Sequence, residues 1–562
     1  MKRGRVVGVL IACVHVLMVA LTFLLLPANA YAQTSWTRIW GQTAYGTMAE
    51  LVRASGAFGN GSGGTVIIAT GDGYWDALAA SGLAGRLHAP VLITPTDSLA
   101  EQTREEIVRI APERILVMGG PAAVTDVVLG ELRTLCPSIE RVYGPNAPNT
   151  ATAIFRAGNG WSKTAIVATS DGYWDALSIA PYAYVEGAPI FLTESSTNSS
   201  GRTLSAQTLE ALGSGSFDEV VIVGGPAVVS EQVEGQIRSV GAVPLRIYGQ
   251  TAIETSAAIA RWELGRGMNC DGLTVATSEG YWDALTGAAF CGTRGSVLVL
   301  EGSENYTAID AIASEYRAAV TNGYVLGGPS AVPSLTYQHL LAVSSVDGSS
   351  GKVALPSQGV AVCIGDSLTS GKIPYYDDAN AWPEYLQDRL DGSWRVVNLG
   401  VIGATLSDRG GTPYRDTGNL DWVADYEPAV VFIMLGTNDA ASSIWSAEDY
   451  RRELAALVDE VRGYVPMAHV VLMAPTRTFC EEGSYFSIDD ERLRTEVREG
   501  VAYVAEQKGA QFVDLYEFTK DHRAWFPDTL HPATTGNEAI ATHLYAQVFV
   551  QTHSLAAENG AR

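Results

Sequence analysis

The chain has 562 residues, of which 47% are hydrophobic and 17% charged, and its formal net charge is −24. A chain of this length exceeds what one hydrophobic core organises, so two or more domains are expected. The acidic balance argues against nucleic acid or an anionic membrane as a partner of the mature protein. The composition is that of a globular protein without low-complexity tracts.

Residues 1–32 have the pattern of an export signal. Three basic residues lie within the first five positions, residues 6–26 are largely apolar, and small residues at 28–32 offer cleavage sites. We expect cleavage near Ala32 and a secreted protein with no membrane segment in its mature form. Two alternatives stay open: the apolar run is long enough to remain as an uncleaved anchor, and residues 10–13 resemble a lipoprotein box.

Three copies of one unit follow, at residues 36–138, 139–243 and 244–342. Each copy opens with a short strand that begins with arginine, passes through a Gly-Tyr-Trp-Asp-Ala-Leu turn and closes on Gly-Gly-Pro. Strands that alternate with helical stretches predict a parallel α/β unit in each copy. The turns lie at Gly73–Leu78, Gly172–Leu177 and Gly280–Leu285, and the closing prolines are Pro121, Pro226 and Pro329.

The aromatic pair in each turn allows two interpretations. In the first, the tyrosines and tryptophans pack between units and the aspartate caps the following helix. In the second, the rings form a platform on which sugar rings stack, repeated three times for avidity. Packing is favoured, and no unit supplies a nucleophile with its base, so catalysis is not expected here. The aspartates are Asp76, Asp175 and Asp283.

The arginine-led openings, the Gly-Tyr-Trp-Asp-Ala-Leu turns and the Gly-Gly-Pro closings, in three tandem copies, resemble cell wall binding repeat 2 (CWB2) modules. The resemblance implies three Rossmann-like lobes around a pseudo-threefold axis. It also implies non-covalent attachment to an anionic polymer or glycan of a Gram-positive cell wall, and so a place at the cell surface.

The cysteines of the mature chain are scattered. None forms a Cys-x-x-Cys pair, so neither a zinc site nor a disulfide scaffold is expected. Cys270 and Cys291 fall in one repeat, and a bridge between them stays open. Cys363 lies in an apolar run and is expected in a core. The other two are Cys136 and Cys480.

Residues 343–358 are polar and rich in glycine and serine, which predicts a flexible linker. Residues 359–553 then alternate apolar strands with helical stretches. This pattern predicts a three-layer αβα, flavodoxin-like sandwich with about five parallel strands, whose functional groups gather beyond the carboxyl ends of the strands. The predicted strands are Val360–Ile364, Trp394–Asn398, Val430–Leu435, His469–Met473 and Gln511–Leu515.

Polar motifs follow four of these strands. Ser367 comes after the first strand, Gly403 after the second, Asn438 after the third, and Asp528 with His531 after the fifth. A serine hydroxyl needs a base, and an imidazole needs a carboxylate to fix its tautomer. The backbone N–H of Ser367 and of Gly403 and the side chain of Asn438 are available for the oxyanion. The pattern predicts a nucleophile, a base, an orienting acid and an oxyanion hole.

Each motif alone also has a structural explanation. Ser367 could cap a helix, Asn438 could cap a local turn, and a single His531 would more often be structural. All of them together at strand ends favour a catalytic site. His469 and His522 are competing bases, but the first opens an apolar strand and the second has no suitably spaced acid, so both are expected to be structural.

These motifs are similar to the four blocks of the SGNH (GDSL-type) hydrolase family. Ser367 matches the serine of the first block, Gly403 and Asn438 the glycine and asparagine of the next two, and Asp528 with His531 the last block. The resemblance implies two-step ester hydrolysis through an acyl-enzyme, without metal or cofactor. It leaves the substrate open, because the family includes lipases, thioesterases and carbohydrate O-acetyl esterases.

The sequence as a whole predicts an exported, wall-attached serine esterase. Its location favours small acyl groups, such as acetyl esters on polysaccharides, over long-chain lipids. Two alternatives stay open. The protein could be a surface adhesin or wall-organising protein whose esterase domain is subsidiary or inactive, or the domain could act as a lipase or thioesterase.

Overall fold

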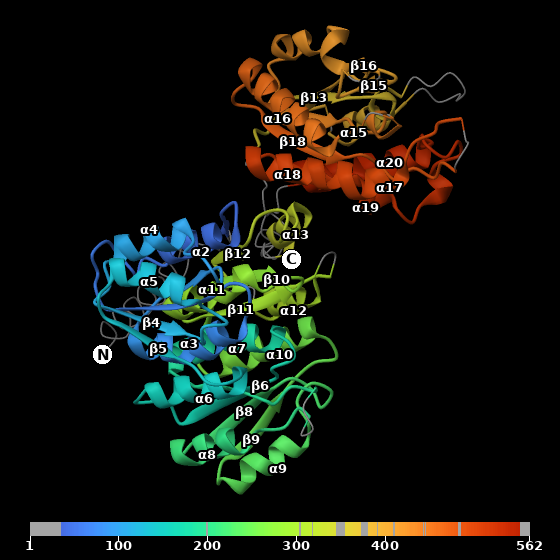
Figure 1. Ribbon diagram of the computed structural model, residues 1–562. Coiled ribbons are helices and arrows are strands. Elements are labelled where there is room, and N and C mark those ends of the chain that lie inside the picture. Colours follow the sequence, from blue (N-terminus) through green and yellow to red (C-terminus); the bar gives the residue numbers. More distant parts are fainter. Residues whose placement is uncertain are drawn as a thin grey trace, which may run out of the picture.

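The computed structural model describes residues 35–550 apart from gaps at 198–200, 303–304, 317–318, 344–354, 372–379, 391, 409–410, 442, 444 and 482–484 (Figure 1). The predicted signal at 1–32 and most of the predicted linker lie outside the described residues. Across the described ranges, no helix combines the length and the apolar character needed to cross a bilayer.

Three four-stranded parallel sheets form the repeat half, one to each lobe, in the orders β3-β2-β4-β5, β7-β6-β8-β9 and β1-β12-β10-β11. The predicted parallel α/β lobes are confirmed. The first lobe contains α2 (Ala44–Ala54), β2 (Thr65–Thr70), α3 (Trp75–Leu87), β3 (Val91–Thr94), α4 (Glu101–Ile110), β4 (Arg114–Met118), α5 (Asp126–Leu135) and β5 (Ile139–Val142).

The second and third lobes repeat this order of helices and strands. The second contains α6 (Ala147–Ala157), β6 (Thr164–Ala168), α7 (Trp174–Glu186), β7 (Ile190–Leu192), α8 (Ala206–Gly215), β8 (Glu219–Val223), α9 (Gln232–Ser239) and β9 (Val243–Ile247). The third contains α10 (Ala252–Gly265), β10 (Asn269–Thr277), α11 (Trp282–Arg294), β11 (Ser296–Glu301), α12 (Thr307–Tyr316), β12 (Asn322–Leu326) and α13 (Ser334–Val343), and it takes β1 (Ser35–Ile39) from the start of the chain.

The opening strand of each copy lies in the sheet of another lobe. β5 and β9 open the second and third copies but pair with β4 and β8 of the preceding lobe. β1 opens the first copy and pairs with β12 of the last, with Ser35 beside Asn322 and Ile39 beside Leu326. The sequence repeat and the structural lobe are therefore offset by one strand, and β1 closes the three lobes into a ring.

The aromatic turns meet at the axis of this ring. The rings of Tyr74, Tyr173 and Tyr281 contact one another edge to face, with centroids 5.4 to 5.5 Å apart. The neighbouring tryptophans lie tilted against these tyrosines and donate their indole N–H groups to carbonyl oxygens of the next lobe. The acceptors are Ser170 for Trp75, Ser278 for Trp174 and Gly71 for Trp282, at 2.7, 2.7 and 3.0 Å. The packing interpretation is confirmed.

The prediction that the aspartates cap the helices is wrong. The N-cap residues of α3, α7 and α11 are the tyrosines, and the aspartates lie inside the first turn of each helix. There each carboxylate presses against the first glycine of a Gly-Gly-Pro closing. A Cβ atom on Gly119 would lie 2.3 Å from an oxygen of Asp76, so this close approach requires glycine at a left-handed φ of 98°.

Cys270 and Cys291 form no disulfide, and both thiols are buried. Burial raises the pKa of each to about 12. These two cysteines therefore serve as small core residues of the third lobe.

The C-terminal domain has one five-stranded parallel sheet in the order β14-β13-β17-β18-β19. All five predicted strands and the αβα layering are confirmed. The strands are β13 (Gly359–Gly365), β14 (Trp394–Asn398), β17 (Val430–Met434), β18 (His469–Ala474) and β19 (Gln511–Asp514), and the main helices are α15 (Trp382–Arg389), α16 (Ala447–Tyr464), α18 (Arg498–Lys508) and α20 (Thr534–Leu544).

Two cores lie on opposite faces of this sheet. Along β13, Val362 and Ile364 join the core under α16 and α18, while Ala361 and Cys363 join the core under α15 and α20. Burial on both faces explains why the strands are continuously apolar. The short elements are α14 (Ser367–Ser370), β15 (Ala404–Thr405), β16 (Thr412–Pro413), η2 (Tyr414–Thr417), η3 (Leu420–Tyr426), η4 (Asp439–Ala441), α17 (Asp490–Arg492), η5 (Leu493–Val497), α19 (Leu515–Thr519), η6 (Arg523–Trp525) and η7 (Tyr545–Phe549).

Candidate active site

A tight turn at the end of β13 presents Ser367. Gly365 ends the strand, and Asp366 caps α14 by accepting a hydrogen bond from the N–H of Leu368 at 2.9 Å. A Cβ atom on Gly365 would lie 2.1 Å from the hydroxyl of Thr369, so only glycine fits where the chain reverses. Ser367 therefore stands at the carboxyl end of a central strand, on the first residue of a short helix.

Ser367, His531 and Asp528 form a continuous hydrogen-bond chain. The Ser367 Oγ lies 2.9 Å from the Nε2 of His531, and the Nδ1 of His531 lies 2.8 Å from Oδ2 of Asp528. Ser367 and His531 are buried residues, 8% and 4% exposed. The structure thus brings together the three residues that the sequence motifs proposed as nucleophile, base and orienting acid.

Asp528 is held by its own loop as well as by the imidazole. Its Oδ1 accepts hydrogen bonds from the N–H groups of Leu530 and His531, at 3.0 and 2.7 Å. Burial raises the pKa of Asp528, but the hydrogen bonds from the His531 ring and from the two N–H groups outweigh burial and leave the pKa below its ordinary value. Asp528 is therefore ionised at neutral pH and fixes the proton on Nδ1, which leaves Nε2 to accept the serine proton.

The predicted oxyanion groups lie on two loops that are bonded together. The Asn438 amide donates to the carbonyl oxygen of Ala404, directly after Gly403, at 2.9 Å. Its contact with Asp366 is longer, 3.4 Å, and so weaker. Gly403 has a left-handed φ of 74° and open space where a Cβ atom would stand. The amide thus has one firm bond and one N–H group that a substrate oxygen can take over.

A buried carboxylate that sequence reasoning left without a role supports these loops. Asp439, next to Asn438, is 2% exposed and accepts hydrogen bonds from the N–H groups of Leu406 and Ser407, at 2.9 to 3.1 Å. Burial raises its pKa although these bonds oppose the effect. Asp439 therefore ties the loop that carries Gly403 to the loop that carries Asn438. Its place in the motif Gly436–Asp439 was the only sequence signal.

Sequence reasoning also missed Thr529, which lies between Asp528 and His531. It has a φ of 75°, a left-handed conformation that is strained for a β-branched residue. Its carbonyl oxygen accepts hydrogen bonds from the N–H of Phe479 at 2.7 Å and the hydroxyl of Thr478 at 3.2 Å. Its hydroxyl lies 3.4 Å from the thiol of Cys480. The residue is held on both sides by one neighbouring segment.

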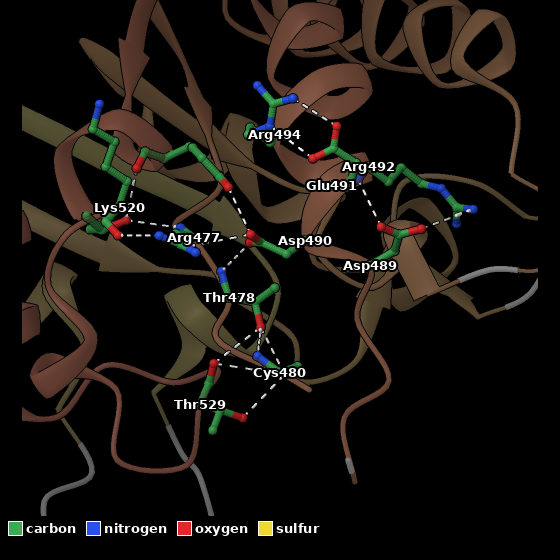
Figure 2. A network of polar contacts seen from close by, with 12 residues as sticks. Arg477, Thr478, Cys480, Asp489, Asp490, Glu491, Arg492, Arg494, Lys520 and Thr529 are labelled. Carbon is green, nitrogen blue, oxygen red and sulfur yellow. Dashed lines mark hydrogen bonds and ion pairs between the residues drawn. The ribbon is translucent and has the colours of Figure 1, made fainter. Parts of the chain in front are cut away.

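Figure 2 shows how that segment is anchored in turn. Asp490 accepts a hydrogen bond from the N–H of Thr478 at 3.1 Å and from the Tyr516 hydroxyl at 3.0 Å. The guanidinium of Arg477 lies 3.5 Å from the same carboxylate. A polar network that includes the start of α17 therefore fixes the segment 477–480, and that segment fixes the loop of Asp528 and His531.

The two competing histidines make contacts of a structural kind. His469 bonds to the side chain of Gln511 at 2.7 Å, and burial lowers its pKa. His522 stacks on Trp525 with centroids 3.8 Å apart. The expectation that both are structural agrees with these partners.

Aromatic side chains border the base. The ring of Phe486 lies edge-on to the imidazole of His531, with centroids 5.1 Å apart. The ring of Tyr485 lies edge-on to that of Phe486, with centroids 5.0 Å apart, and Tyr485 is 88% exposed. Ile402, next to Gly403, is 52% exposed. Among the residues that the structure describes, no group of three or more His, Cys, Asp or Glu side chains is placed to hold a metal ion.

Two protein families match separate parts of the chain. Residues 38–129, 141–234 and 246–337 match the family described as cell wall binding domain 2 (CWB2). Residues 363–539 match the GDSL-like lipase/acylhydrolase family. Both matches agree with the resemblances noted in the sequence.

Individual relatives resemble parts of the chain. The N-acetylmuramoyl-L-alanine amidase LytC of Bacillus subtilis (strain 168) is 28% identical over 51% of this chain and 54% of that protein. An acetylxylan esterase of Xylanibacter ruminicola is 26% identical over 33% of this chain and 42% of that protein. The solved structure of Cwp8 from Clostridium difficile is 24% identical, covers 55% of this chain and 52% of that chain, and has a TM-score of 0.48. The chain spans about half of the length of these curated relatives.

Proposed function

We propose that this chain, three CWB2 repeats followed by an SGNH-type carboxylic ester hydrolase, is an exported esterase that removes small acyl groups from a polysaccharide at the cell wall. The observation that carries the proposal is the unbroken hydrogen-bond chain from Ser367 through His531 to Asp528, at 2.9 and 2.8 Å. The wall-binding repeats support the place where the reaction occurs.

In the proposed acylation step, the Ser367 oxygen attacks the ester carbonyl carbon while Nε2 of His531 takes the hydroxyl proton. The carbonyl oxygen becomes an oxyanion, and the N–H groups of Ser367 and Gly403 and the Asn438 amide stabilise it. His531 then gives its proton to the departing alcohol, and the C–O bond to that alcohol breaks. The acyl group remains as an ester of Ser367.

Deacylation uses the same groups in the opposite order. A water molecule attacks the acyl carbon while His531 removes one of its protons. When the tetrahedral species collapses, the proton passes to the Ser367 oxygen and the carboxylic acid leaves. Asp528, ionised at neutral pH, stabilises the imidazolium that forms in both steps.

Three observations support an acetyl ester of a carbohydrate as the substrate. The repeats support a location among wall glycans. One relative of the chain is named an acetylxylan esterase. The aromatic border of Tyr485 and Phe486 beside His531 offers ring faces of the kind on which a sugar can rest.

A chain-length series tests the acyl specificity. The full chain is assayed with p-nitrophenyl esters from acetate to decanoate and with an O-acetylated polysaccharide. We expect the highest kcat/KM for acetate and release of acetate from the polysaccharide. A preference for acyl groups of ten or more carbons would replace this proposal with a lipase.

A wall-binding assay with Ser367→Ala separates the enzyme from the adhesin alternative. We expect the variant to bind isolated cell walls as the native protein does and to lose esterase activity. Equal hydrolysis by both proteins would refute the assignment of Ser367 as the nucleophile. Wall binding by a native protein that hydrolyses none of the esters would favour a chiefly adhesive or wall-organising protein.

A further inference from the structure

In the first two lobes, the arginine of the opening strand is bound by the same kinds of group, two carbonyl oxygens and one acid. Arg141 lies in β5 and donates to two carbonyl oxygens of the first lobe and to Asp126 at 3.3 Å. Arg246 lies in β9, contacts two equivalent carbonyls and bonds to Glu234 at 3.0 Å. In both lobes, the acid comes from the last helix of that lobe, α5 or α9. The carbonyl acceptors are Gly119 and Val124 for Arg141, and Gly224 and Val229 for Arg246.

The third lobe repeats the arginine and the two carbonyls but not the acid. Arg38, in β1, donates to the carbonyl oxygens of Gly327 and Val332 at 3.0 and 2.8 Å. Counted from the first glycine of each closing, Ser334 stands where the first lobe has Asp126, and Tyr337 stands where the second has Glu234. The helix α13 has the sequence SLTYQHLLAV, without any acid.

The C-terminal domain supplies the missing acid. Glu506, near the end of α18, accepts hydrogen bonds from Nε and Nη2 of Arg38 at 2.6 and 3.1 Å. The two side chains are only 5% and 7% exposed. Two helical turns earlier in α18, the carboxylate of Glu499 accepts two hydrogen bonds from the start of α13. The donors are the N–H groups of Ser334 and Leu335, at 2.7 and 3.2 Å. Thus α18 satisfies both the arginine and the helix N-terminus of the third lobe.

We infer that the C-terminal domain is docked on the third lobe in one fixed position. Its helix α18 supplies the acid that pairs with the arginine of the opening strand, which each of the other lobes takes from its own last helix. Two observations agree on this: the acid is absent from α13, and acids are present on the helix that packs against it. A buried two-pronged arginine–carboxylate pair is directional and shielded from solvent, unlike an exposed pair. The two halves therefore hold one fixed orientation, and the linker is not their only connection. This inference does not depend on the ester chemistry.

The docking also predicts that the repeat half is less stable when it is expressed alone. Without α18, Arg38 would keep its two carbonyl acceptors but lose the carboxylate that balances its buried charge. Because Arg38 lies on β1, the strand that closes the ring, we expect this loss to weaken the pairing of β1 with β12. We therefore test the docking in the full chain.

Limited proteolysis of the predicted linker, residues 343–358, tests the docking. The native protein is compared with a Glu499→Ala/Glu506→Ala variant and with Glu234→Ala, which removes the equivalent acid inside the second lobe. We expect the linker of the double variant to be cut at least tenfold faster, and the maximum dimension in small-angle X-ray scattering to increase. Glu234→Ala should leave both quantities unchanged.

Esterase activity checks that the C-terminal domain of each variant is folded, because none of these residues touches Ser367 or His531 in the described structure. Arg38→Gln removes the pair from the other side and must also speed cleavage of the linker. If the native linker is cut as fast as that of the double variant, or if native scattering requires many domain orientations, the inference is overturned.

Discussion

The repeat half and the C-terminal domain both place their distinctive side chains just beyond the carboxyl ends of parallel strands. In the repeats, these positions carry Tyr74, Tyr173 and Tyr281, which meet one another at the axis. In the C-terminal domain, they carry Ser367, Asn438 and His531, which face a site bordered by partly exposed rings. The same position in the fold thus holds lobes together where another lobe covers it. In the C-terminal domain, no other lobe of the described chain covers it, and it carries the proposed catalytic residues.

The largest expected effect comes from removing Ser367, the proposed nucleophile. Ser367→Ala should lower kcat/KM by about a thousandfold or more, because no other group in the Ser367–His531–Asp528 chain can accept the acyl group. Ser370→Ala, further along the same short helix, is the matched control and should keep its activity. Steady-state hydrolysis of an acetyl ester measures both. Loss of activity in Ser370→Ala alone would show that Ser367 is not the nucleophile.

The next largest effect is expected at Asp528, the proposed orienting acid. Asp528→Asn should lower kcat by about a hundredfold to ten-thousandfold, since an amide favours the wrong imidazole tautomer. Because the folded pKa of Asp528 is below its ordinary value, its contribution to stability is present above the unfolded pKa, about 3.9, and is lost as pH falls through the folded pKa. Kinetics at neutral pH and acid unfolding from pH 6 to 2 measure the two effects. An unchanged kcat would remove Asp528 from the proposed mechanism.

The tyrosine ring tests the cohesive half of the comparison. Tyr173→Ala removes edge-to-face contacts with both other tyrosines and should lower the free energy of unfolding by about 2–4 kcal/mol. Esterase kinetics of the intact protein should stay the same. Urea unfolding followed by circular dichroism measures the change. If stability is unaffected but wall binding is lost, the sugar-platform interpretation of these turns would return.

Thr529 offers a smaller test inside the loop that carries Asp528 and His531. Thr529→Gly relieves the left-handed strain and should raise the free energy of unfolding by about 1 kcal/mol. Thr529→Ala keeps the strain and loses the contact with Cys480, so kcat should fall several-fold with little change in KM. Urea titration and kinetics of both variants separate relief of strain from loss of positioning. Equal activity in Thr529→Ala and the native protein would mean that the carbonyl contacts alone hold the loop.

The smallest expected effect concerns pH. Burial raises the pKa of Asp175 to about 6. The folded state then holds a proton that the unfolded state releases, so the contribution of Asp175 makes the protein less stable as pH rises from about 4 to about 6. Asp175→Asn should therefore be more stable than the native protein at pH 8, by about 1 kcal/mol after solvent screening, and similar to it at pH 4.5. Thermal unfolding at both values measures this, with the exposed Asp97→Asn as a control that should show no such difference.

Much of the C-terminal domain could be predicted because its signals are local. Each strand is a short apolar run. Ser367, Gly403 and Asn438 follow their strands within five positions, and Asp528 and His531 come on the loop before the last helix, so the parallel order of the sheet brings them to one edge. The contacts by which the segment 477–480 holds Thr529 could not be predicted in this way. It depends on a backbone conformation and on contacts between segments about 50 residues apart, which no spacing rule describes.

The repeats show the opposite limit. Their period revealed three units, but a period does not say which sheet an opening strand joins, and β1 joins the last one. The sequence suggested that Asp76 caps its helix, yet the turn placed Tyr74 at the cap. The absence of an acid from α13 was visible in the sequence, but it acquired meaning only when Arg38 was seen to contact Glu506.

The closure of the ring by β1 has a consequence for how the protein is made. Ser35 and its partner Asn322 are 287 residues apart in the chain, so during synthesis the first strand emerges long before the strand with which it pairs. Parallel pairing over such a distance forms slowly and leaves apolar residues such as Trp36 uncovered meanwhile. The ring therefore cannot close until the last repeat has been made, which is compatible with the export proposed for this protein, because an exported chain completes its fold only after it has crossed the membrane.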